Sequence, residues 1–336
     1  MCSSDLCYQR GGTRPTVTDA DLLLGRLDPH NFAGGAIVLD TAKSADAMVA
    51  DIGGRLGLAA QECSYGVSEV VDESMANAAR AHAVENGRAI DEFTMIAFGG
   101  AAPIHAARLG EKLGIAKVLI PASAGVGSAV GFLKAPFGYE VIRSAFMRVD
   151  TVDMDMVNTI FDEISAETAA FLEQGVQTAQ PVWERRAFMR YVGQGYELRV
   201  PFPTGPIDAA ALAKAFDAFH EVHKREYGHH FADSGIEIVN LRLVGAASAA
   251  RIARPTAGAA KSLEAAKVRD GTGTFRVDGK LADYPTTFYR RDLLPAGEKI
   301  AGPAIILQMD TTTVVPPQHS FEADTAGNLI IRKMDA

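Results

Sequence analysis

The chain has 336 residues, of which 48% are hydrophobic and 22% charged, and its formal net charge is −8 at pH 7. This composition is typical of a globular protein of about two domains and excludes an extended disordered chain. The negative charge argues against nucleic acid or an anionic membrane surface as a partner. We find no signal peptide and no apolar run of the roughly 18 residues that a membrane helix needs, which predicts a cytoplasmic protein. Three cysteines without a CxxC motif indicate neither a disulfide framework nor a cysteine-rich zinc site.

The first six residues differ in character from the stretch that begins at Cys7. The sequence MCSSDL runs directly into CYQRGGTRPTVTDADLLLGRLDP, which has the turn and helix signals of a domain interior. The hexapeptide is also what the end of a common sequencing adapter encodes in one frame. We therefore expect residues 1–6 to be non-native and the reading frame to be truncated on its 5′ side, with an ordinary start of the chain as the alternative. Within the second stretch, Thr18 or Asp19 is expected to cap a helix that contains three consecutive leucines.

The first half of the chain alternates helical and strand-like patterns. We expect helices over residues 44–60, with an interruption at Gly53-Gly54, and over residues 64–87, 103–113 and 124–133, and strands over residues 93–98 and 117–120. The strand, glycine turn, helix and strand between residues 93 and 120 predict a βαβ unit with two parallel strands.

The second half carries two longer helical patterns and more strand signals. Helices are expected over residues 153–174 and 208–227, and strands over residues 185–201 as a hairpin around Gly193-Gln194-Gly195, and over residues 236–245, 274–277, 299–308, 311–315 and 329–332. Residues 246–273 show little periodicity and predict a mobile linker. The last 60 or so residues are therefore expected to form a compact β-rich module.

The sequence FGGAAP, residues 98–103, is the best candidate for a ligand site. Its glycines allow the backbone to approach a ligand, and the helix after it offers free N–H groups to an anion or a nucleotide. The segment is neither GxGxxG nor GxxxxGK[ST], and no acidic ribose partner stands at the expected distance. A structural turn is the alternative to a binding turn.

Each of the other polar candidates can be interpreted either as a functional residue or as a structural one. Asp19 and Asp21 are weak catalytic or Mg²⁺ candidates, and helix capping is the default interpretation. His105 lies in the first turns of a helix, where the dipole is expected to lower its pKa, and core packing is favoured over acid–base work. Cys63 is interpreted as a buried small hydrophobe. Four histidines have a spacing that could seat a metal, or lie on a solvated helix face and turn: His220, His223, His229 and His230.

Several motifs resemble one known family. The stretch MIAFGGAAPIHAARLGEKLGIAKVLIPASAGVGSAVGFL resembles the adenosine-side motif of actin-like and sugar-kinase-like ATPases, and more specifically the hydantoinase A/oxoprolinase family. In the same order, the chain also contains CYQRGGTRPTVTDADLLLGRLDP, MANAARAHAVENGR, VGQGYELRVP, YGHHFADSGIEIVNLRLVGAA and IAGPAIILQMDTTTVVPP, which are similar to segments of that family. The resemblance covers Cys7 to the C-terminus.

The resemblance implies a fold and a domain order. The fold class is α/β: residues 7–145 correspond to the second half of an actin-like (ribonuclease H-like) ATPase domain. An α+β, β-rich domain similar to the C-terminal domain of acetophenone carboxylase occupies residues 150–336, with the linker at about 246–273. Gly99, Gly100 and Ala101 would contact adenosine and Ala102 and Pro103 would shape the turn, so the implied cofactor-binding residues are Gly99, Gly100, Ala101, Ala102, Pro103 and Ser128.

The function implied by the resemblance is an ATP-dependent hydrolase subunit. It opens a cyclic amide of the hydantoin or 5-oxoproline type through a phosphorylated intermediate, with ATP and Mg²⁺ as cofactors and a B-type subunit or domain as its partner. Phosphorylation converts the amide oxygen into a leaving group, and Mg²⁺ neutralises charge on the transferred phosphate. One alternative is the ATP-using subunit of a carboxylase that acts on a ketone such as acetone or acetophenone. Another is a non-catalytic fragment or partner-binding module.

Two departures from the family pattern affect this interpretation. The family's phosphate-binding loops of the Asp-x-Gly-Gly-Thr type precede the CYQRGG segment and are not found in this sequence, so we expect the chain to be inactive alone. The turn usually reads GGAGP in the family, whereas here Ala102 replaces a glycine, which is expected to place a methyl group close to the ligand.

Overall fold

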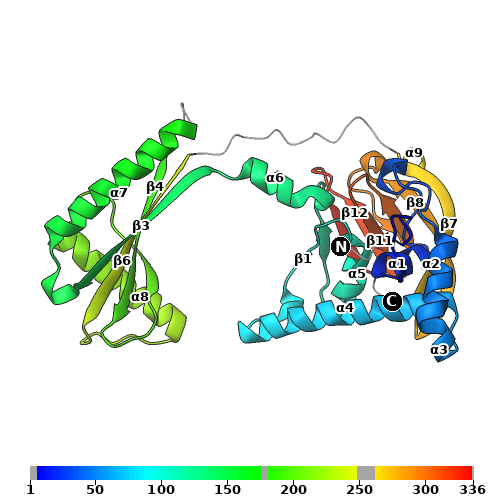
Figure 1. Cartoon of the computed structure of the whole chain (residues 1–336), viewed down its shortest axis with the longest axis horizontal. Coiled ribbons are helices and arrows are strands. Elements are labelled where there is room, and N and C mark those ends of the chain that lie inside the picture. Colours follow the sequence, from blue (N-terminus) through cyan, green and yellow to red (C-terminus); the bar gives the residue numbers. More distant parts are fainter. Residues whose placement is uncertain (1–5, 176–180, 248–261, 335–336) are drawn as a thin grey trace. The chain divides into compact units, whose positions relative to one another are not determined.

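The computed structural model describes residues 6–175, 181–247 and 262–334 (Figure 1). The chain divides into two compact units: unit 1 contains residues 1–131 and 253–336, and unit 2 contains residues 132–252. This division differs from the boundary expected near residues 145–150. The physical reason is that the C-terminal strands pair with strands from the first half of the chain, so the last part of the sequence belongs to unit 1.

Unit 1 contains two mixed sheets. The five-stranded sheet has the order β1 (Met95–Ile96), β2 (Val118–Ile120), β13 (Leu329–Lys333), β12 (His319–Ala323) and β9 (Ile300–Ala301). The four-stranded sheet has the order β11 (Thr312–Val315), β10 (Ala304–Leu307), β8 (Lys280–Arg290) and β7 (Lys267–Val277). Strands β1 and β2 are parallel and are joined through α5 (Ala102–Leu113), which confirms the predicted βαβ unit. Strand β13 pairs antiparallel with β2 and thereby joins β1 and β2 to the C-terminal strands of the same sheet.

Most helices of unit 1 match the expected pattern, but the last one lies within the predicted linker. The helices are α1 (Val17–Leu23), α2 (Thr41–Met48), α3 (Gly54–Leu56), α4 (Ala60–Glu85), α5, α6 (Gly127–Lys134, which runs into unit 2) and α9 (Leu263–Ala266). A π-helical turn, η3 (Val49–Gly53), confirms the predicted interruption at Gly53-Gly54. A side chain at Gly53 would come within 2.5 Å of the Leu58 carbonyl oxygen, so the turn depends on glycine there. Short 3₁₀ turns complete the chain: η2 (Ala33–Gly35), η4 (Ile90–Glu92), η5 (Ala124–Val126), η6 (Val149–Thr151) and η7 (Arg291–Leu293).

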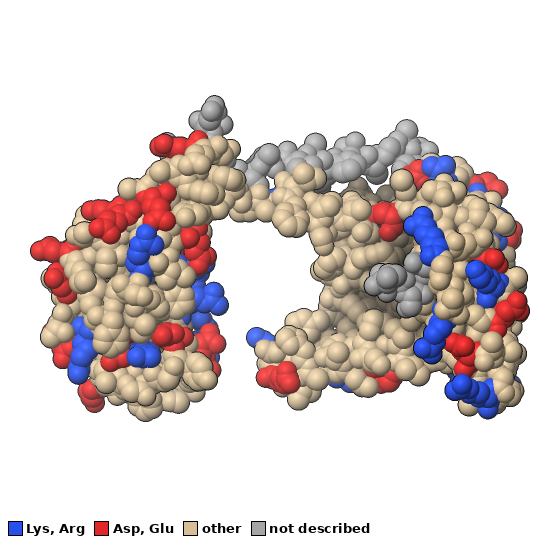
Figure 2. All heavy atoms as spheres, in the orientation of Figure 1, with Lys and Arg blue, Asp and Glu red and all other residues tan. Residues whose placement is uncertain are grey.

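Unit 2 is an antiparallel sheet packed with two helices. Its strands have the order β3 (Phe137–Arg148), β6 (Ile236–Ala247), β4 (Val182–Tyr191) and β5 (Leu198–Pro201). Helices α7 (Met154–Gly175) and α8 (Ala209–Tyr227) share one hydrophobic core with this sheet. The β4–β5 hairpin confirms the sequence prediction, as do the cap of α8 by Asp208, which accepts from the Ala211 N–H at 2.7 Å, and its end at Gly228. In Figure 2, Lys and Arg are interspersed with Asp and Glu over the face of each unit that is drawn.

The linker prediction is wrong over part of its length. Residues 246–247 end β6, and residues 267–273 lie in β7, where they pair antiparallel with β8. This segment is rich in glycine and polar residues, so its strand comes from backbone pairing rather than from an apolar alternation. Strands β3, β8 and β12 are also absent from the predicted elements. Residues 248–261 of the predicted linker lie outside the described residues, as do residues 1–5 of the predicted non-native start, while Leu6 is buried.

Candidate functional site

A cavity of about 390 Å³ lies in unit 1, where the turn after β1 meets the segment between β10 and β11. Its walls include Asp21 of α1, Gly100 and Ala101 of the turn, and His105 of α5. Asp310, which comes after β10, completes this polar part of the wall. The volume falls in the range of about 300–1,000 Å³ that is usual for small-molecule pockets. The cavity therefore brings together three of the residues that the sequence indicates as site candidates.

The glycine turn is held by residues that are distant in sequence. The Thr311 hydroxyl Oγ1 lies 3.2 Å from the Gly99 carbonyl oxygen and 2.9 Å from that of Gly100, to which it can donate. Gly99 has a φ of 125°, a conformation that favours glycine, and its N–H donates to the Ala124 carbonyl at 2.7 Å. A side chain at Gly125 would come within 2.1 Å of the Asp310 carbonyl oxygen. The turn, the start of the next helical segment and residues 310–311 are thus packed backbone against backbone.

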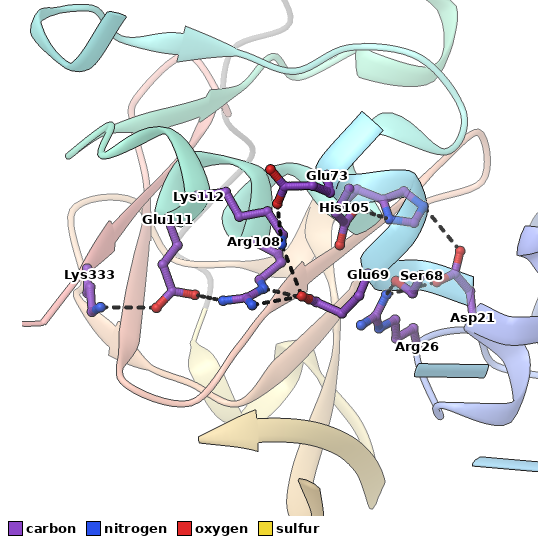
Figure 3. Close-up of polar contacts among 11 residues, drawn as sticks. Asp21, Arg26, Ser68, Glu69, Glu73, His105, Arg108, Glu111, Lys112 and Lys333 are labelled. Atoms are coloured by element: carbon purple, nitrogen blue, oxygen red, sulfur yellow. Dashed lines mark hydrogen bonds and ion pairs between the residues drawn. The ribbon is translucent and has the colours of Figure 1, made fainter. Parts of the chain in front are cut away.

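Behind the cavity lies a buried charged cluster, part of which is drawn in Figure 3. The His105 ring stands between two carboxylates: Nε2 lies 3.3 Å from Asp21 Oδ2, and Nδ1 lies 2.9 Å from Asp72 Oδ1. Arg26 Nη1 donates to Asp21 Oδ1 at 3.0 Å and to the Ser68 hydroxyl at 2.7 Å. All five residues are buried. Asp21 therefore lines the cavity, and its negative charge is balanced by Arg26 and His105.

The charge of His105 is set by these neighbours. Burial by itself would lower the pKa of His105, but the hydrogen bonds and negative charges of Asp21 and Asp72 outweigh it and raise the pKa to about 9. The expected lowering by the helix dipole is therefore wrong. Asp72 is fully buried, and the contact of its Oδ1 with His105 Nδ1 at 2.9 Å is its ion pair in the described part of the chain. The imidazolium of His105 is consequently the counter-charge of a fully buried carboxylate.

An ion-pair network fixes α5, which carries His105, against α4 (Figure 3). Glu69 of α4 accepts from Arg108 Nε at 2.8 Å and from Lys112 Nζ at 3.0 Å, and Arg108 also donates to Glu111 at 2.6 Å. Burial by itself would raise the pKa of Glu69, but its two cationic partners outweigh this effect and lower the pKa to about 2. Glu69 is thus ionised at neutral pH and holds the two helices together.

The remaining sequence candidates lie outside the wall of this cavity. Asp19 is buried and accepts from the Thr16 N–H at 2.8 Å and from the Ser44 hydroxyl at 2.7 Å, so it closes the first turn of α1. The N-cap is Thr16 rather than the expected Thr18 or Asp19. Gly99 supports the turn through its backbone. Ala102 and Pro103 begin α5, and Ser128 is exposed on α6. Ala102 is not among the residues that line the cavity.

Asp310 is the site residue that sequence reasoning missed. It lines this cavity and also an adjacent one of about 580 Å³, and within the described chain no hydrogen bond reaches its buried Oδ2. The buried Arg291 lies close enough for the Asp310 charge to oppose the effect of burial, which lowers the pKa of Arg291 to about 10. The only sequence signal was its place in the motif IAGPAIILQMDTTTVVPP, because more than two hundred residues separate it from the glycine turn.

The cysteine and metal candidates are not among the residues that line this cavity. Cys63 is buried and packs near Ala20 and Met48, which confirms the interpretation as a small hydrophobe. Over the described ranges, no three His, Cys, Asp or Glu side chains are grouped so that they could hold a metal ion. No helix in the described part of the chain has the length and apolar character needed to span a membrane.

Two family models match the chain. The hydantoinase/oxoprolinase model matches residues 2–141, and the hydantoinase/oxoprolinase C-terminal domain model matches residues 148–332. The chain therefore belongs to the hydantoinase/oxoprolinase family, as the motif resemblance predicted.

Similar proteins are carboxylases and an amidohydrolase. The acetophenone carboxylase gamma subunit of Aromatoleum aromaticum is 32% identical, over 98% of this chain and 46% of its own length. The nucleotide-free structure of acetone carboxylase matches with a TM-score of 0.82 at 27% identity, over 98% of this chain and 48% of that one. The ATP-dependent caprolactamase from Pseudomonas jessenii matches with a TM-score of 0.75 at 29% identity, over 97% of this chain and 48% of that one. These likenesses support the α/β fold class, and the chain spans about half the length of each of these relatives.

Proposed function

We propose that this chain belongs to an ATP-dependent enzyme that opens a cyclic amide, and that the 390 Å³ cavity of unit 1 holds the adenosine part of ATP in an actin-like ATPase domain. One observation carries the proposal: Gly100 and Ala101, at the start of α5, share a cavity with Asp21, His105 and Asp310. Because the chain spans about half the length of its relatives, the activity is proposed for the whole protein that contains this cavity.

The chemistry of the cavity wall suits a nucleoside. The free N–H groups at the N-terminus of α5 can donate to polar atoms of the nucleotide. A carboxylate only accepts hydrogen bonds, so Asp310 is suited to the hydroxyl donors of a ribose. Tyr8 and Phe32 also line the cavity, and their rings stack at 5.5 Å, which gives an aromatic surface for a base. The unsatisfied buried oxygen of Asp310 is consistent with a ligand that donates.

We also propose that Asp21 contributes to Mg²⁺ binding in this site. Asp21 lines the cavity and forms ion pairs with Arg26 and His105. Mg²⁺ is usually bound by one or two carboxylates together with substrate phosphates, and Asp21 supplies one carboxylate in this wall. Mg²⁺ bound there would neutralise phosphate charge, while His105 and Asp72 position Asp21 from behind.

A ketone carboxylase is the second candidate, and a specific observation favours it. The TM-score is higher to acetone carboxylase, at 0.82, than to the caprolactamase, at 0.75. The acetophenone carboxylase relative is named as a gamma subunit, which supports a multi-subunit enzyme. We therefore propose a B-type subunit or domain as the partner under either activity.

Nucleotide binding by this 336-residue chain tests the cavity. Titration calorimetry with ATP and Mg²⁺ is expected to show saturable binding that Gly100→Leu abolishes by filling the cavity. At Gly100 an added Cβ would come no closer than 3.8 Å to a neighbouring atom, so the backbone itself leaves room for a side chain. Gly131→Leu, at a glycine with open space around it, is the matched control and should bind normally. Absence of ATP binding to the unaltered chain would contradict the proposal and favour a non-catalytic, partner-binding module.

The reaction class is decided by a second measurement on the whole protein with its partner. ATP hydrolysis that a cyclic amide stimulates without bicarbonate supports the amidohydrolase. Stimulation by a ketone that requires bicarbonate supports the carboxylase instead.

A further inference from the structure

Unit 2 contains a cavity that the proposed ATP site does not use. Its volume is about 360 Å³, and it lies where the hairpin turn after β4 meets α8 and the loop at the end of that helix. Two sequence motifs, VGQGYELRVP and YGHHFADSGIEIVNLRLVGAA, supply most of its wall. The two motifs are separated in the chain by α8, and folding brings their aromatic and amide side chains to one place.

Five rings line this cavity: Tyr191, His223, Tyr227, His229 and Phe231. Most neighbouring rings are steeply inclined to one another, although His223 and Tyr227 are tilted by 47°. The interplanar angle is 66° for Tyr191 and His223, 70° for Tyr191 and Phe231, and 71° for His229 and Phe231, with ring centroids 4.8, 5.5 and 4.9 Å apart. A flat heterocycle is held best between parallel walls, whereas a corner of steeply inclined rings suits a compact, rounded group.

Hydrogen bonds hold these rings in place before any ligand arrives. The Tyr191 hydroxyl oxygen accepts from the Phe231 N–H at 2.8 Å. Gln194 Oε1 accepts from the Tyr191 N–H at 3.1 Å, so the amide nitrogen of Gln194 faces His223 Nε2, 3.4 Å away. His223 Nδ1 lies 2.7 Å from the His229 carbonyl oxygen and must donate to it, which leaves Nε2 as an acceptor. The cavity is therefore preorganised.

The residue types that line the cavity determine which charge a ligand should carry. The lining comprises the five rings with Val192, Gln194 and Ser234, and so contains no Lys, Arg, Asp or Glu. An anion finds no permanent positive charge there, and among the described residues no three His, Cys, Asp or Glu side chains are grouped so that they could hold a metal ion. Ring faces attract a cation, most strongly one that sheds water easily, such as a substituted ammonium. Tyr227 and Phe231 are about half exposed, so the rings are open to a ligand from solution.

We propose that this aromatic corner of unit 2 is a binding site for a small organic ammonium ion. The rings supply the attraction by cation–π contact, and their fixed, steeply inclined arrangement surrounds a rounded cationic head from several sides. The site is independent of the proposed ATP cavity, since every wall residue belongs to unit 2.

The test compares a cation with its neutral isostere. Choline and 3,3-dimethyl-1-butanol have the same shape and differ in charge, and each is titrated into the full chain while the aromatic and imidazole NMR signals are followed. Choline is expected to bind at least about fivefold more tightly than the alcohol. Phe231→Leu, which keeps apolar bulk but removes a ring, is expected to weaken choline binding by about threefold to fivefold.

A matched control lies in the same hairpin. Tyr196 is 80% exposed and outside the cavity wall, so Tyr196→Leu should leave choline binding unchanged. Circular dichroism of both variants reports whether unit 2 remains folded, and Tyr227→Leu replaces Phe231→Leu if the latter does not fold. Equal binding of choline and the alcohol, tighter binding of a flat lactam such as 2-pyrrolidinone, no saturable binding of choline, or equal losses in the Phe231 and Tyr196 variants would each overturn the proposal.

Discussion

Replacing His105 by glutamine should expose the energetic role of the buried charged cluster. The change removes the imidazolium that stands 2.9 Å from Asp72 and leaves a buried carboxylate without a counter-charge. The pKa of His105 is raised from 6.5 to about 9, and each pKa unit corresponds to about 1.4 kcal/mol, so the imidazolium contributes about 3 kcal/mol to the free energy of unfolding.

The sign of the pH dependence is given by the direction of the shift. A group whose pKa is raised on folding stabilises the folded state fully below its unfolded pKa, here about 6.5, and loses that contribution as the pH rises through about 9. Urea unfolding followed by circular dichroism at pH 6 and pH 9 should therefore show the unaltered chain losing about 3 kcal/mol more than His105→Gln over this interval. At pH 6 the variant should be about 3 kcal/mol less stable.

Two controls make this experiment specific. The only tryptophan, Trp183, lies in β4 of unit 2, so its fluorescence reports the unfolding of the unit that does not contain His105. Its transition should not move. The double variant His105→Gln with Asp72→Asn removes both charges and should recover part of the lost stability. An identical pH dependence in the unaltered chain and in His105→Gln, or an equal shift of the Trp183 transition, would contradict this role of the imidazolium.

Three further outcomes are expected. Gly125→Ala should destabilise unit 1 by at least about 2 kcal/mol in urea unfolding, because its methyl group would meet the Asp310 backbone, whereas Gly131→Ala in α6 should be neutral or slightly stabilising; equal effects would contradict the close packing. Glu69→Gln should lower the free energy of unfolding by about 1–2 kcal/mol at pH 7. The difference between the variant and the unaltered chain should shrink as the pH falls from 4.5 towards 2, because the carboxylate protonates and loses its pairing with Arg108. A difference that persists at pH 2 would argue against the ion pair. Asp310→Asn should reduce the preference for ATP over 2′,3′-dideoxy-ATP in calorimetry, and an undiminished preference would remove Asp310 from ribose recognition while leaving ATP binding intact.

Much of the secondary structure could be predicted because its signals are local. The βαβ unit around Gly99-Gly100 has apolar runs bounded by glycine and proline, and α8 begins with the Asp208 cap and ends at Gly228. Only residues 274–277 of β7 were predicted, because residues 267–273 are stabilised by pairing with β8, and backbone pairing leaves no apolar periodicity in the sequence.

Part of the candidate site could likewise be predicted from the sequence, and part could not. Short motifs were enough to identify the family, the glycine turn and the candidates Asp21, Gly100 and Ala101, because the chemistry of each motif is local. The folded chain was needed to place Asp310 at the turn and Asp72 behind His105. Those contacts depend on the return of the C-terminal strands to unit 1 and on the packing of α4 against α5, and interactions between residues so far apart in the chain have no signature in local sequence.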